Sequence, residues 1–418
     1  MRTGLTPAEA LRLILEEVPV LPPETVAATA ALGRVLAEPV ASSRRLPPYD
    51  NSAMDGYALR LADVVGAGSG RPAELHVAFE VAAGAVADKP LGEGEAARIF
   101  TGAPLPPRAD AVVRQEDTER DGDRVRIRVV PEPRENVRDA GEDVEVGDRV
   151  LEPGVAIGPA ELGLLASLGR SVVAVHQSPR VAILSGGDEL VEPDGDVAGG
   201  RIVSSNSWSL AAHCRQLGAE PLYLGIARDT PDDVEAHLRA GMGMDVLVSS
   251  AGVSVGDRDH VRGALEGLGC RLLFWGVEMK PGYPLAFGRF ESGGRALVFG
   301  LPGNPVSAMV TFEQFVRPAL RRMMGFRSLF RPRVQARLAE DLRKKAGRLH
   351  FVRVQLERRG EEIVATSTGN QSSGVLRSMA LAQGLLIFPA EETRLEAGDT
   401  VTVQVLDADF LAAATPGF

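Results

Sequence analysis

The sequence predicts a multidomain protein of the α/β plus β class, in which a central doubly wound parallel sheet is combined with small β domains. Between residues 180 and 326, short apolar runs alternate with helical patterns, as in a parallel sheet that helices cover on both faces. Before and after this segment, β-like runs are separated by turns rich in Gly and Pro. With 418 residues, the chain has room for about three domains.

The N-terminal residues predict a helix with a well-marked start. Thr6 can serve as the N-cap, Pro7 fits the first helical position and Glu9 can complete a capping box. An apolar stripe at the i, i+3, i+4 spacing follows. Pro22-Pro23 ends this helix, and we expect a second helical stretch that runs to about Leu36.

A small β domain is predicted from Leu46 onward. Its strands are expected at residues 76–81, 95–100, 111–115 and 124–130. A connection rich in Gly and Pro follows, with a helix near residues 160–168.

The central segment is predicted to hold parallel strands and the helices that connect them. The strands are expected at residues 181–184, 222–224, 245–248, 272–274 and 296–299. The helices are expected at residues 207–217, from Thr230-Pro231 onward, and from Asn304-Pro305 to about Met324. Ligands of such folds bind beyond the C-terminal ends of the strands.

The C-terminal residues return to a β pattern. Apolar and polar side chains alternate with period two at residues 352–357 and 401–405. This alternation predicts a small C-terminal β domain with one wet face.

Charge and composition exclude some classes of partner. The net charge of −10 argues against a general binder of nucleic acid or anionic membranes, which would need a basic surface. No apolar run approaches the roughly 20 residues of a membrane-spanning helix, and the N-terminus lacks the apolar region of a signal peptide. Cys214 and Cys270 fit no metal-binding spacing and are expected to be buried thiols. We therefore expect a cytoplasmic protein.

Polar loops follow three of the predicted strands, at the edge where a ligand is expected. They span residues 185–190, 249–259 and 300–305. Their small residues would let backbone N–H groups approach a phosphate, and carboxylates beside a phosphate make sense as ligands of Mg²⁺. The alternative is that the loops are plain turns whose carboxylates cap helices. Three such loops at one edge favour the ligand site.

Lys280 forms a second point of interest. It lies between a strand and a Pro-Gly turn, so its stiffly placed charge could hold an oxyanion. A solvated surface lysine is the alternative that spacing alone leaves open.

Long motifs run through the chain in a fixed order. They are residues 47–58 (PPYDNSAMDGYA), 101–106 (TGAPLP), 141–143 (GED), 185–190, 252–256 (GVSVG), 280–282 (KPG) and 301–307 (LPGNPVS). In these motifs the chain resembles the molybdopterin molybdenumtransferase family, to which bacterial MoeA and the C-terminal domain of gephyrin belong. The similarity covers essentially the whole chain.

The resemblance implies an elongated homodimer of four domains. Residues 1–45 and 140–177 would form a composite dimerisation domain, 46–139 an inserted β domain, 178–326 an α/β domain that resembles molybdopterin adenylyltransferase, and 327–418 a C-terminal β-barrel-like domain. The active site would form between the α/β domain of one subunit and β domains of the other.

The resemblance also implies an activity, the insertion of molybdate into the dithiolene of adenylyl-molybdopterin with release of AMP, and Mg²⁺ as the cofactor. The expected partners are these substrates, a second copy of the chain and, as a further candidate, the molybdopterin adenylyltransferase. A non-catalytic scaffold and an adenylyltransferase remain as alternatives. The acid cluster with Lys280 argues against the scaffold, and the flanking β domains argue against the adenylyltransferase.

Carried over motif by motif, the resemblance assigns catalytic roles to Asp55, Glu189, Asp259 and Lys280. The substrate-binding candidates are Thr101, Arg138, Asp229, Ser254, Pro302, Pro305, Arg353, Ser372 and Ser373, and the Mg²⁺ ligands would be Asp143, Glu189 and Asp259. Simpler readings remain open: turn residues for Asp55 and Thr101, surface ion pairs for the arginines and loop stiffening for the prolines.

The chain departs from the family pattern at two positions where lysines are common. Gly276 and Tyr283 stand there, and the lysines are among the proposed molybdate contacts. We therefore expect Lys280 to carry more of the oxyanion binding.

Overall fold

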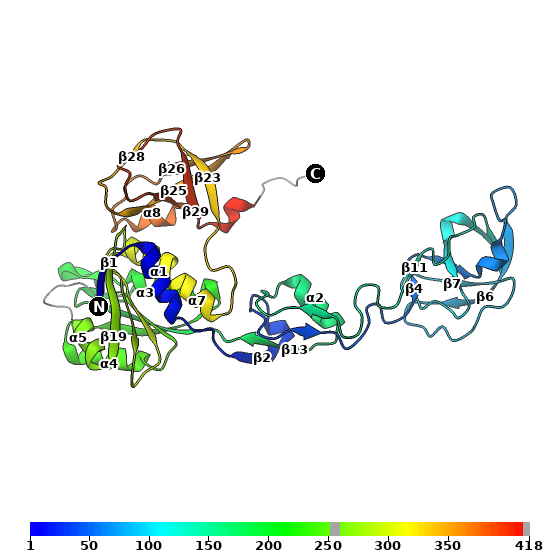
Figure 1. Cartoon of the computed structure of the whole chain (residues 1–418), viewed down its shortest axis with the longest axis horizontal. Coiled ribbons are helices and arrows are strands. Elements are labelled where there is room, and N and C mark those ends of the chain that lie inside the picture. The colour runs from blue at the N-terminus through cyan, green and yellow to red at the C-terminus, as the bar shows by residue number, and fades with distance from the viewer. Residues whose placement is uncertain (251–259, 413–418) are drawn as a thin grey trace.

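The chain folds into an elongated molecule with three regions along its length. The computed structural model describes residues 1–250 and 260–412. An α/β unit and a C-terminal barrel stack at one end, a slender unit lies in the middle, and a β domain forms the far end (Figure 1). We call this last part, residues 51–138, the distal domain.

The α/β unit is built on a seven-stranded sheet. Its order is β1 (Arg2–Leu5), β19 (Cys270–Val277), β21 (Ala286–Phe290), β22 (Leu297–Gly300), β18 (Val246–Ser249), β14 (Arg180–Gly186) and β17 (Glu220–Ala227). The predicted strands β14, β17, β18 and β22 are parallel, as expected. The sequence did not predict β21, which lies between β19 and β22 and is antiparallel to both. The connection from β19 to β21 is too short for a helical crossover.

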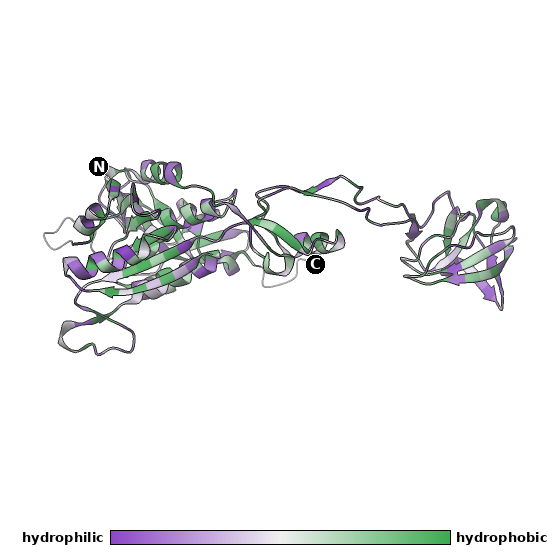
Figure 2. Ribbon diagram, turned by 90° about the horizontal axis from the view of Figure 1, so that it is seen from below, coloured by the Kyte–Doolittle hydropathy of each residue, from purple (hydrophilic) through white to green (hydrophobic). Residues whose placement is uncertain are grey.

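Helices cover both faces of this sheet, as predicted. One face carries α4 (Pro231–Gly241) and α5 (His260–Gly267), and the other carries α1 (Pro7–Glu17), α3 (Ser205–Leu217), α6 (Pro305–Thr311) and α7 (Arg317–Met323). The strands between them are apolar, and the polar residues lie on the outer faces of the helices (Figure 2). The long helix expected after Asn304 contains a π-helical turn, Phe312–Val316, between α6 and α7. A small pair of strands, β15 (Leu190–Val191) and β16 (Ile202–Val203), lies at the edge.

The N-terminal helix starts as predicted, but it packs against the α/β unit and not in the composite domain. Thr6 accepts a hydrogen bond from the Glu9 N–H, and the Glu9 carboxylate accepts one from the Thr6 N–H. Ala10 and Ile14 are buried in the α/β core, and β1 pairs with β19. Residues 2–17 thus lie with the α/β unit, whereas the boundaries above grouped residues 1–45 with the composite domain.

The middle unit joins two distant pieces of chain. β2 (Pro23–Ala27) pairs with β13 (Val172–His176), and β3 (Val40–Ala41) pairs with β12 (Arg149–Leu151). The helix predicted near residues 160–168 is α2 (Pro159–Ser167). The second helical stretch predicted to Leu36 is wrong, because the segment after Pro22 is extended and its alternate side chains face this small core.

The distal domain holds a six-stranded sheet. Its order is β8 (Ala111–Arg114), β5 (Gly56–Leu59), β7 (Glu95–Ile99), β6 (Ala73–Val81), β10 (Arg124–Ile127) and β9 (Thr118–Asp121). A two-stranded ribbon, β4 (Asn51–Ser52) with β11 (Val137–Arg138), connects it to the middle unit.

The C-terminal β domain is a closed five-stranded barrel. Its ring runs β25 (Leu349–Arg359), β26 (Glu362–Ser367), β23 (Arg333–Leu338), β29 (Thr400–Val405), β27 (Gly384–Phe388) and back to β25. β24 (Leu342–Arg343) pairs with β28 (Arg394–Leu395), and α8 (Leu376–Ala380) faces the α/β unit. β20 (Met279–Lys280) of the α/β unit extends this sheet by pairing with β25.

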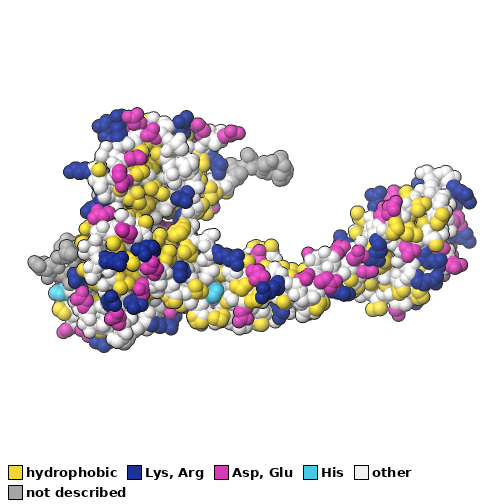
Figure 3. Space-filling model, viewed as in Figure 1, with side chains coloured by type: hydrophobic (Ala, Val, Ile, Leu, Met, Phe, Trp, Pro, Cys, Tyr) yellow, Lys and Arg dark blue, Asp and Glu magenta, His cyan; other side chains and the backbone are white. Residues whose placement is uncertain are grey.

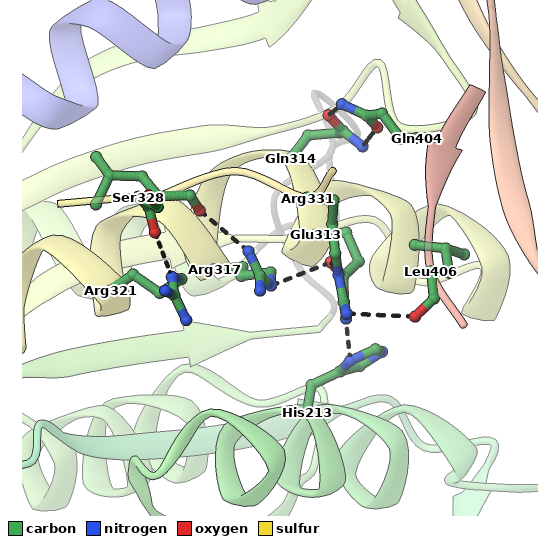
Figure 4. Close-up of polar contacts among 10 residues, drawn as sticks. His213, Glu313, Gln314, Arg317, Arg321, Ser328, Arg331, Gln404 and Leu406 are labelled. Atoms are coloured by element: carbon green, nitrogen blue, oxygen red, sulfur yellow. Dashed lines mark hydrogen bonds and ion pairs between the residues drawn. The ribbon is translucent and has the colours of Figure 1, made fainter. Parts of the chain in front are cut away.

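A buried ion cluster ties the barrel to the α/β unit (Figure 4). Glu313, on the π-helical turn, accepts two hydrogen bonds from Arg331, each of 2.9 Å. His213 on α3 and Arg317 on α7 lie within 3.3 and 3.6 Å of the same carboxylate. Arg331 also donates to the Leu406 carbonyl, which follows the last barrel strand. The cluster therefore fixes where the barrel sits on the helices.

Candidate functional site

A polar pocket of about 650 Å³ opens at the carboxyl ends of the parallel strands. Three predicted residues, Glu189, Pro302 and Pro305, line it. Glu189 comes from the loop after β14, Pro302 from the loop after β22, and Pro305 from the first position of α6. Sequence reasoning placed a ligand at this edge, and the pocket lies there.

The floor of this pocket is a network of buried serine hydroxyls. Ser185 lies 3.3 Å from Ser250 and accepts a hydrogen bond from Ser204, oxygen to oxygen. Ser204 in turn lies 3.1 Å from Ser207. Ser204 is the N-cap of the 13-residue helix α3, so free backbone N–H groups and the positive end of the helix dipole lie beside the pocket.

Asn206 is a pocket residue that sequence reasoning missed. It donates a hydrogen bond of 2.7 Å to the Gly303 carbonyl, which joins α3 to the loop before α6. Its Oδ1 is buried and has no hydrogen-bond partner among the described residues. The signal was a polar residue just before the helix predicted at residues 207–217, which is too common to single out.

Glu189 lies exposed at the rim of this pocket, with its carboxylate folded over Gly187. The Glu189 backbone carbonyl accepts a hydrogen bond from the Ile202 N–H, and its carboxylate makes no ion pair or hydrogen bond with another described residue. Asp229 lies on the neighbouring loop, where its N–H donates to the Asp188 carboxylate at 3.2 Å. Within the described residues there is no group of three or more His, Cys, Asp or Glu side chains that could hold a metal ion.

A second pocket, of about 600 Å³, lies where the α/β unit meets the barrel. The predicted Lys280 and Arg353 both line it. The other basic residues on its wall are Arg343, Lys344, Lys345, Arg348 and His350, and Glu278 is the carboxylate among its described residues. In an acidic chain, this is the local positive field that an oxyanion requires.

Arg353 fixes the loop at residues 370–374, which forms the wall between the two pockets. It is 1% exposed, and burial lowers its pKa to about 10. Its Nε donates to the Ser378 hydroxyl and its Nη2 donates to the Ser372 carbonyl. The Ser373 carbonyl in turn accepts from the Val306 N–H at the start of α6. The wall loop therefore separates the cationic pocket, which Gln371 lines, from the polar pocket, which Gly374 lines.

Arg348 occupies the space near one of the missing family lysines. Its guanidinium lies 4.1 Å from the centre of the Tyr283 ring, and its Nε donates to Glu278 at 3.1 Å. His350 stays neutral at physiological pH, because burial, with the charges of Lys280, Lys344 and Arg348, lowers its pKa to about 4. The barrel thus contributes a fixed positive charge, that of Arg348, to this pocket. This contribution was not predicted from the sequence.

Asp55 and Thr101 come together in the distal domain. The Asp55 carboxylate accepts hydrogen bonds of 2.8 Å from the Thr101 N–H and from its hydroxyl. These bonds, aided by the charge of Arg98, hold the Asp55 pKa below its usual range. Gly56 is required next to Asp55, because a Cβ there would lie 2.0 Å from the Val113 carbonyl oxygen.

Two further predicted residues that the structure describes, Arg138 and Asp143, line neither pocket. Arg138 lies on the ribbon that carries the distal domain, opposite Asn51, and Asp143 is exposed just beyond it. Figure 1 shows the distal domain at the opposite end of the subunit from the α/β unit. Ser254 and Asp259 lie outside the described residues. One subunit alone therefore does not assemble the predicted site.

Surface charge and helix length bear on whether nucleic acid or a membrane could be a partner. On the face seen in Figure 3, basic and acidic side chains are interspersed along the whole molecule. In the described part of the chain, no helix is long and apolar enough to cross a membrane.

Comparisons with known proteins cover nearly the whole chain. The family description "MoeA N-terminal region (domain I and II)" matches residues 5–169, "Probable molybdopterin binding domain" matches 182–322, and "MoeA C-terminal region (domain IV)" matches 335–406. A molybdopterin molybdenumtransferase of Nostoc sp. is 39% identical over 91% of this chain and 88% of its own length. The protein of the same name from Haemophilus influenzae is 36% identical over 96% and 98%.

A solved structure shares the whole fold. The molybdopterin biosynthesis MoeA protein of Pyrococcus horikoshii superposes with a TM-score of 0.83 and 32% identity, over 96% of this chain and 99% of that one. Sequence, domain order and fold agree, and the chain belongs to the MoeA family of molybdopterin molybdenumtransferases.

Proposed function

We propose that this protein inserts molybdenum from molybdate into the dithiolene of adenylyl-molybdopterin and releases AMP. Membership of the family gives the class of reaction. The observation that carries the proposal is the pair of pockets, one polar and one cationic, on either side of the loop at residues 370–374. A large phosphate-bearing substrate and a small oxyanion can meet across that loop.

The polar pocket suits the phosphates of adenylyl-molybdopterin. The N-terminus of α3 offers unpaired backbone N–H groups, and the serine network beneath it is already satisfied internally. Pro302 and Pro305 hold the facing loop rigid, so Gly303 and the N–H groups near it stay in place. These groups would bind and orient the substrate at little entropic cost.

The cationic pocket suits molybdate, a tetrahedral dianion. The Lys280 ammonium is exposed in it and makes no ion pair with another described residue. Arg348, fixed by Tyr283 and Glu278, adds a charge that does not have to be ordered on binding. Preorganised positive groups of this kind stabilise charge that shifts as oxygen ligands of molybdenum are exchanged for sulfur.

Mg²⁺ would be held by Glu189 together with phosphate oxygens of the substrate. A hard cation of this kind commonly takes one or two protein carboxylates and completes its shell with phosphates and water. The Glu189 carboxylate, exposed at the rim and unpaired among the described residues, fits that chemistry. When bound, the ion would neutralise phosphate charge and polarise the phosphoanhydride. We place Asp259 in the same ligand set and leave Asp143 to a subunit partner.

We further propose that the enzyme works as a homodimer in the cytoplasm. A second subunit would bring its Asp55, Thr101, Arg138 and Asp143 to the α/β unit of the first. The free buried thiols of Cys214 and Cys270 suit a reducing compartment. The molybdopterin adenylyltransferase, which makes this class of substrate, is the candidate donor.

The direct test is turnover with defined substrates. The purified protein is incubated with adenylyl-molybdopterin, Mg²⁺ and molybdate, and AMP is quantified together with activation of an apo-molybdoenzyme. We expect AMP release that depends on molybdate and matches the molybdenum inserted. Adenylylation of molybdopterin by ATP, or binding without AMP release, would overturn the proposal.

A further inference from the structure

The Asp55–Thr101 pair sits at an exposed loop tip and needs support. Asp55 belongs to the turn between β4 and β5, and Thr101 follows β7 on the neighbouring strand. A catalytic contact on such a loop loses precision unless its shape is fixed from below.

Arg98 lies beneath this pair, on β7. Its guanidinium is half-buried between two aromatic rings, 5.0 Å from the centre of Tyr57 and 5.1 Å from that of Phe100. One end donates to the Gly56 carbonyl at 3.3 Å, and the other donates to the Gln115 side chain at 2.6 Å. Gln115 connects Arg98 back to Asp55, because the Gln115 backbone N–H donates a hydrogen bond of 3.0 Å to the Asp55 carbonyl.

We propose that Arg98 is a positioning residue, which holds the Asp55–Thr101 pair in its reactive geometry through Gly56 and Gln115. The inference rests on the proposed function, in which Asp55 takes part in turnover. The planar guanidinium is suited to this task because it can stack between the rings and still bond sideways to both groups. A lysine keeps the charge but cannot make both bonds from between two rings.

The alternative is that Arg98 only fills space in the distal domain. The contacts of Arg98 argue against that alternative. Both hydrogen bonds that its side chain makes with described residues go to residues that adjoin or bond Asp55, and its charge also acts on the Asp55 carboxylate. Arg128, in the same domain, donates to Glu119 on the neighbouring strand and serves as a control.

The test is a double-mutant cycle on the full-length dimer. Arg98→Met keeps the apolar stem between the rings, and Arg98→Lys keeps the charge. We expect kcat to fall about tenfold or more in Arg98→Met, with the KM for molybdate unchanged, and Arg98→Lys to fall between it and the wild type. Arg98→Met with Asp55→Asn should be no slower than Asp55→Asn alone, because both changes disable the same pair. Arg128→Met should retain wild-type turnover.

Three outcomes would overturn the inference. Normal turnover of Arg98→Met beside an impaired Asp55→Asn would remove Arg98 alone from the account. Fully multiplicative losses in the double variant would show that Arg98 does not act through Asp55. Normal turnover of Asp55→Asn would overturn the inference and, with it, the proposed role of the distal domain. Should Arg98→Met unfold, the cycle run with Arg98→Lys decides in the same way.

Discussion

Asp55 is kept ionised by its neighbours in the distal domain. The Thr101 N–H and hydroxyl both donate to it and hold its pKa below the usual range. A carboxylate with a lowered pKa stays charged to lower pH, so the activity that needs it persists in mild acid and is lost as the pH falls through that pKa.

The first prediction is that Thr101→Val moves this acid limit upward. The variant loses the hydroxyl donor but keeps the backbone donor, so the Asp55 pKa rises toward its ordinary value. The acidic limb of the kcat/KM profile should shift to higher pH. Thr366→Val, an exposed position in the barrel, should leave the profile where it is. An unshifted limb in Thr101→Val would show that Asp55 does not titrate in turnover.

The second prediction concerns removal of the Asp55 charge itself. Asp55→Asn should lower kcat by about 10²- to 10⁴-fold, the range for a lost group that takes part in chemistry. The fold should be unaffected, because Asp55 is a partly exposed turn residue and no core is lost. Asp123→Asn, exposed in the same domain, is the matched control. Near-normal AMP release would return Asp55 to the role of a turn residue.

Lys280 should act on the oxyanion rather than on the fold. The third prediction is that Lys280→Ala raises the molybdate concentration for half-maximal rate about ten- to thirtyfold, on the order of 1.5–2 kcal/mol for a charge-assisted contact. The exposed Lys89→Ala in the distal domain should have no such effect. An unchanged molybdate dependence would move the oxyanion to another part of the cationic pocket.

The π-helical turn places a buried carboxylate between two folding units. Burial opposes the charge of Glu313, but hydrogen bonds from His213 and Arg331 outweigh it and lower its pKa to about 2. The folded-state pKa is thus below the ordinary value of 4.5. The stabilisation is fully present above about pH 4.5 and is lost as the pH falls toward 2.

The fourth prediction is that Glu313→Gln lowers the free energy of unfolding at neutral pH by about 3–5 kcal/mol, because it leaves the buried Arg317 and the partly buried Arg331 without a counter-charge. The variant should also lose the extra acid sensitivity between pH 4.5 and 2. Glu357→Gln, which breaks an exposed ion pair with Arg359, should cost less than about 1 kcal/mol. Equal effects of the two changes would contradict the role given to the cluster.

Local sequence patterns predicted many of the helices and strands. The predictions that were wrong failed for physical reasons. The capping box at Thr6 and the Pro231 and Pro305 helix starts act within a few residues, and the structure contains them. The segment after Pro22 looked helical, but its pairing with β13 depends on residues about 150 positions away. The antiparallel strand β21 was missed for a similar reason. A strand that follows a hairpin and one that follows a crossover differ only in the connection before them, not in their own residues.

The site was predictable only where it lies on one unit. Glu189, Pro302 and Pro305 follow strands whose ends must meet at one sheet edge, so their shared pocket could be expected. The basic residues of the barrel around Arg348 reach Lys280 only because β20 pairs with β25, a contact that no local pattern encodes. Asp55 and Thr101 were linked to the site only through the resemblance to a family.

The elongated subunit separates the halves of the proposed site. The α/β unit and barrel hold both pockets, and the distal domain at the other end holds Asp55 and Thr101 (Figure 1). A two-fold symmetric dimer would let each distal domain serve the pockets of its partner. Light scattering should therefore give the mass of two chains, and a stable monomer with full activity would contradict the arrangement.

The most direct measurement of the shared site is complementation between two impaired variants, assayed at a limiting molybdate concentration at which both Asp55→Asn and Lys280→Ala are slow. In a mixed dimer of one Asp55→Asn subunit and one Lys280→Ala subunit, a shared site would leave one of the two sites without any lesion. Random mixing makes half of the dimers mixed, so AMP release should return to about a quarter of the wild-type rate. Mixing Asp55→Asn with Thr101→Ala should restore nothing, because both lesions lie in the distal domain. If verified mixed dimers of the first pair are no faster than the parent variants at that molybdate concentration, each site is built within one subunit and the central claim is wrong.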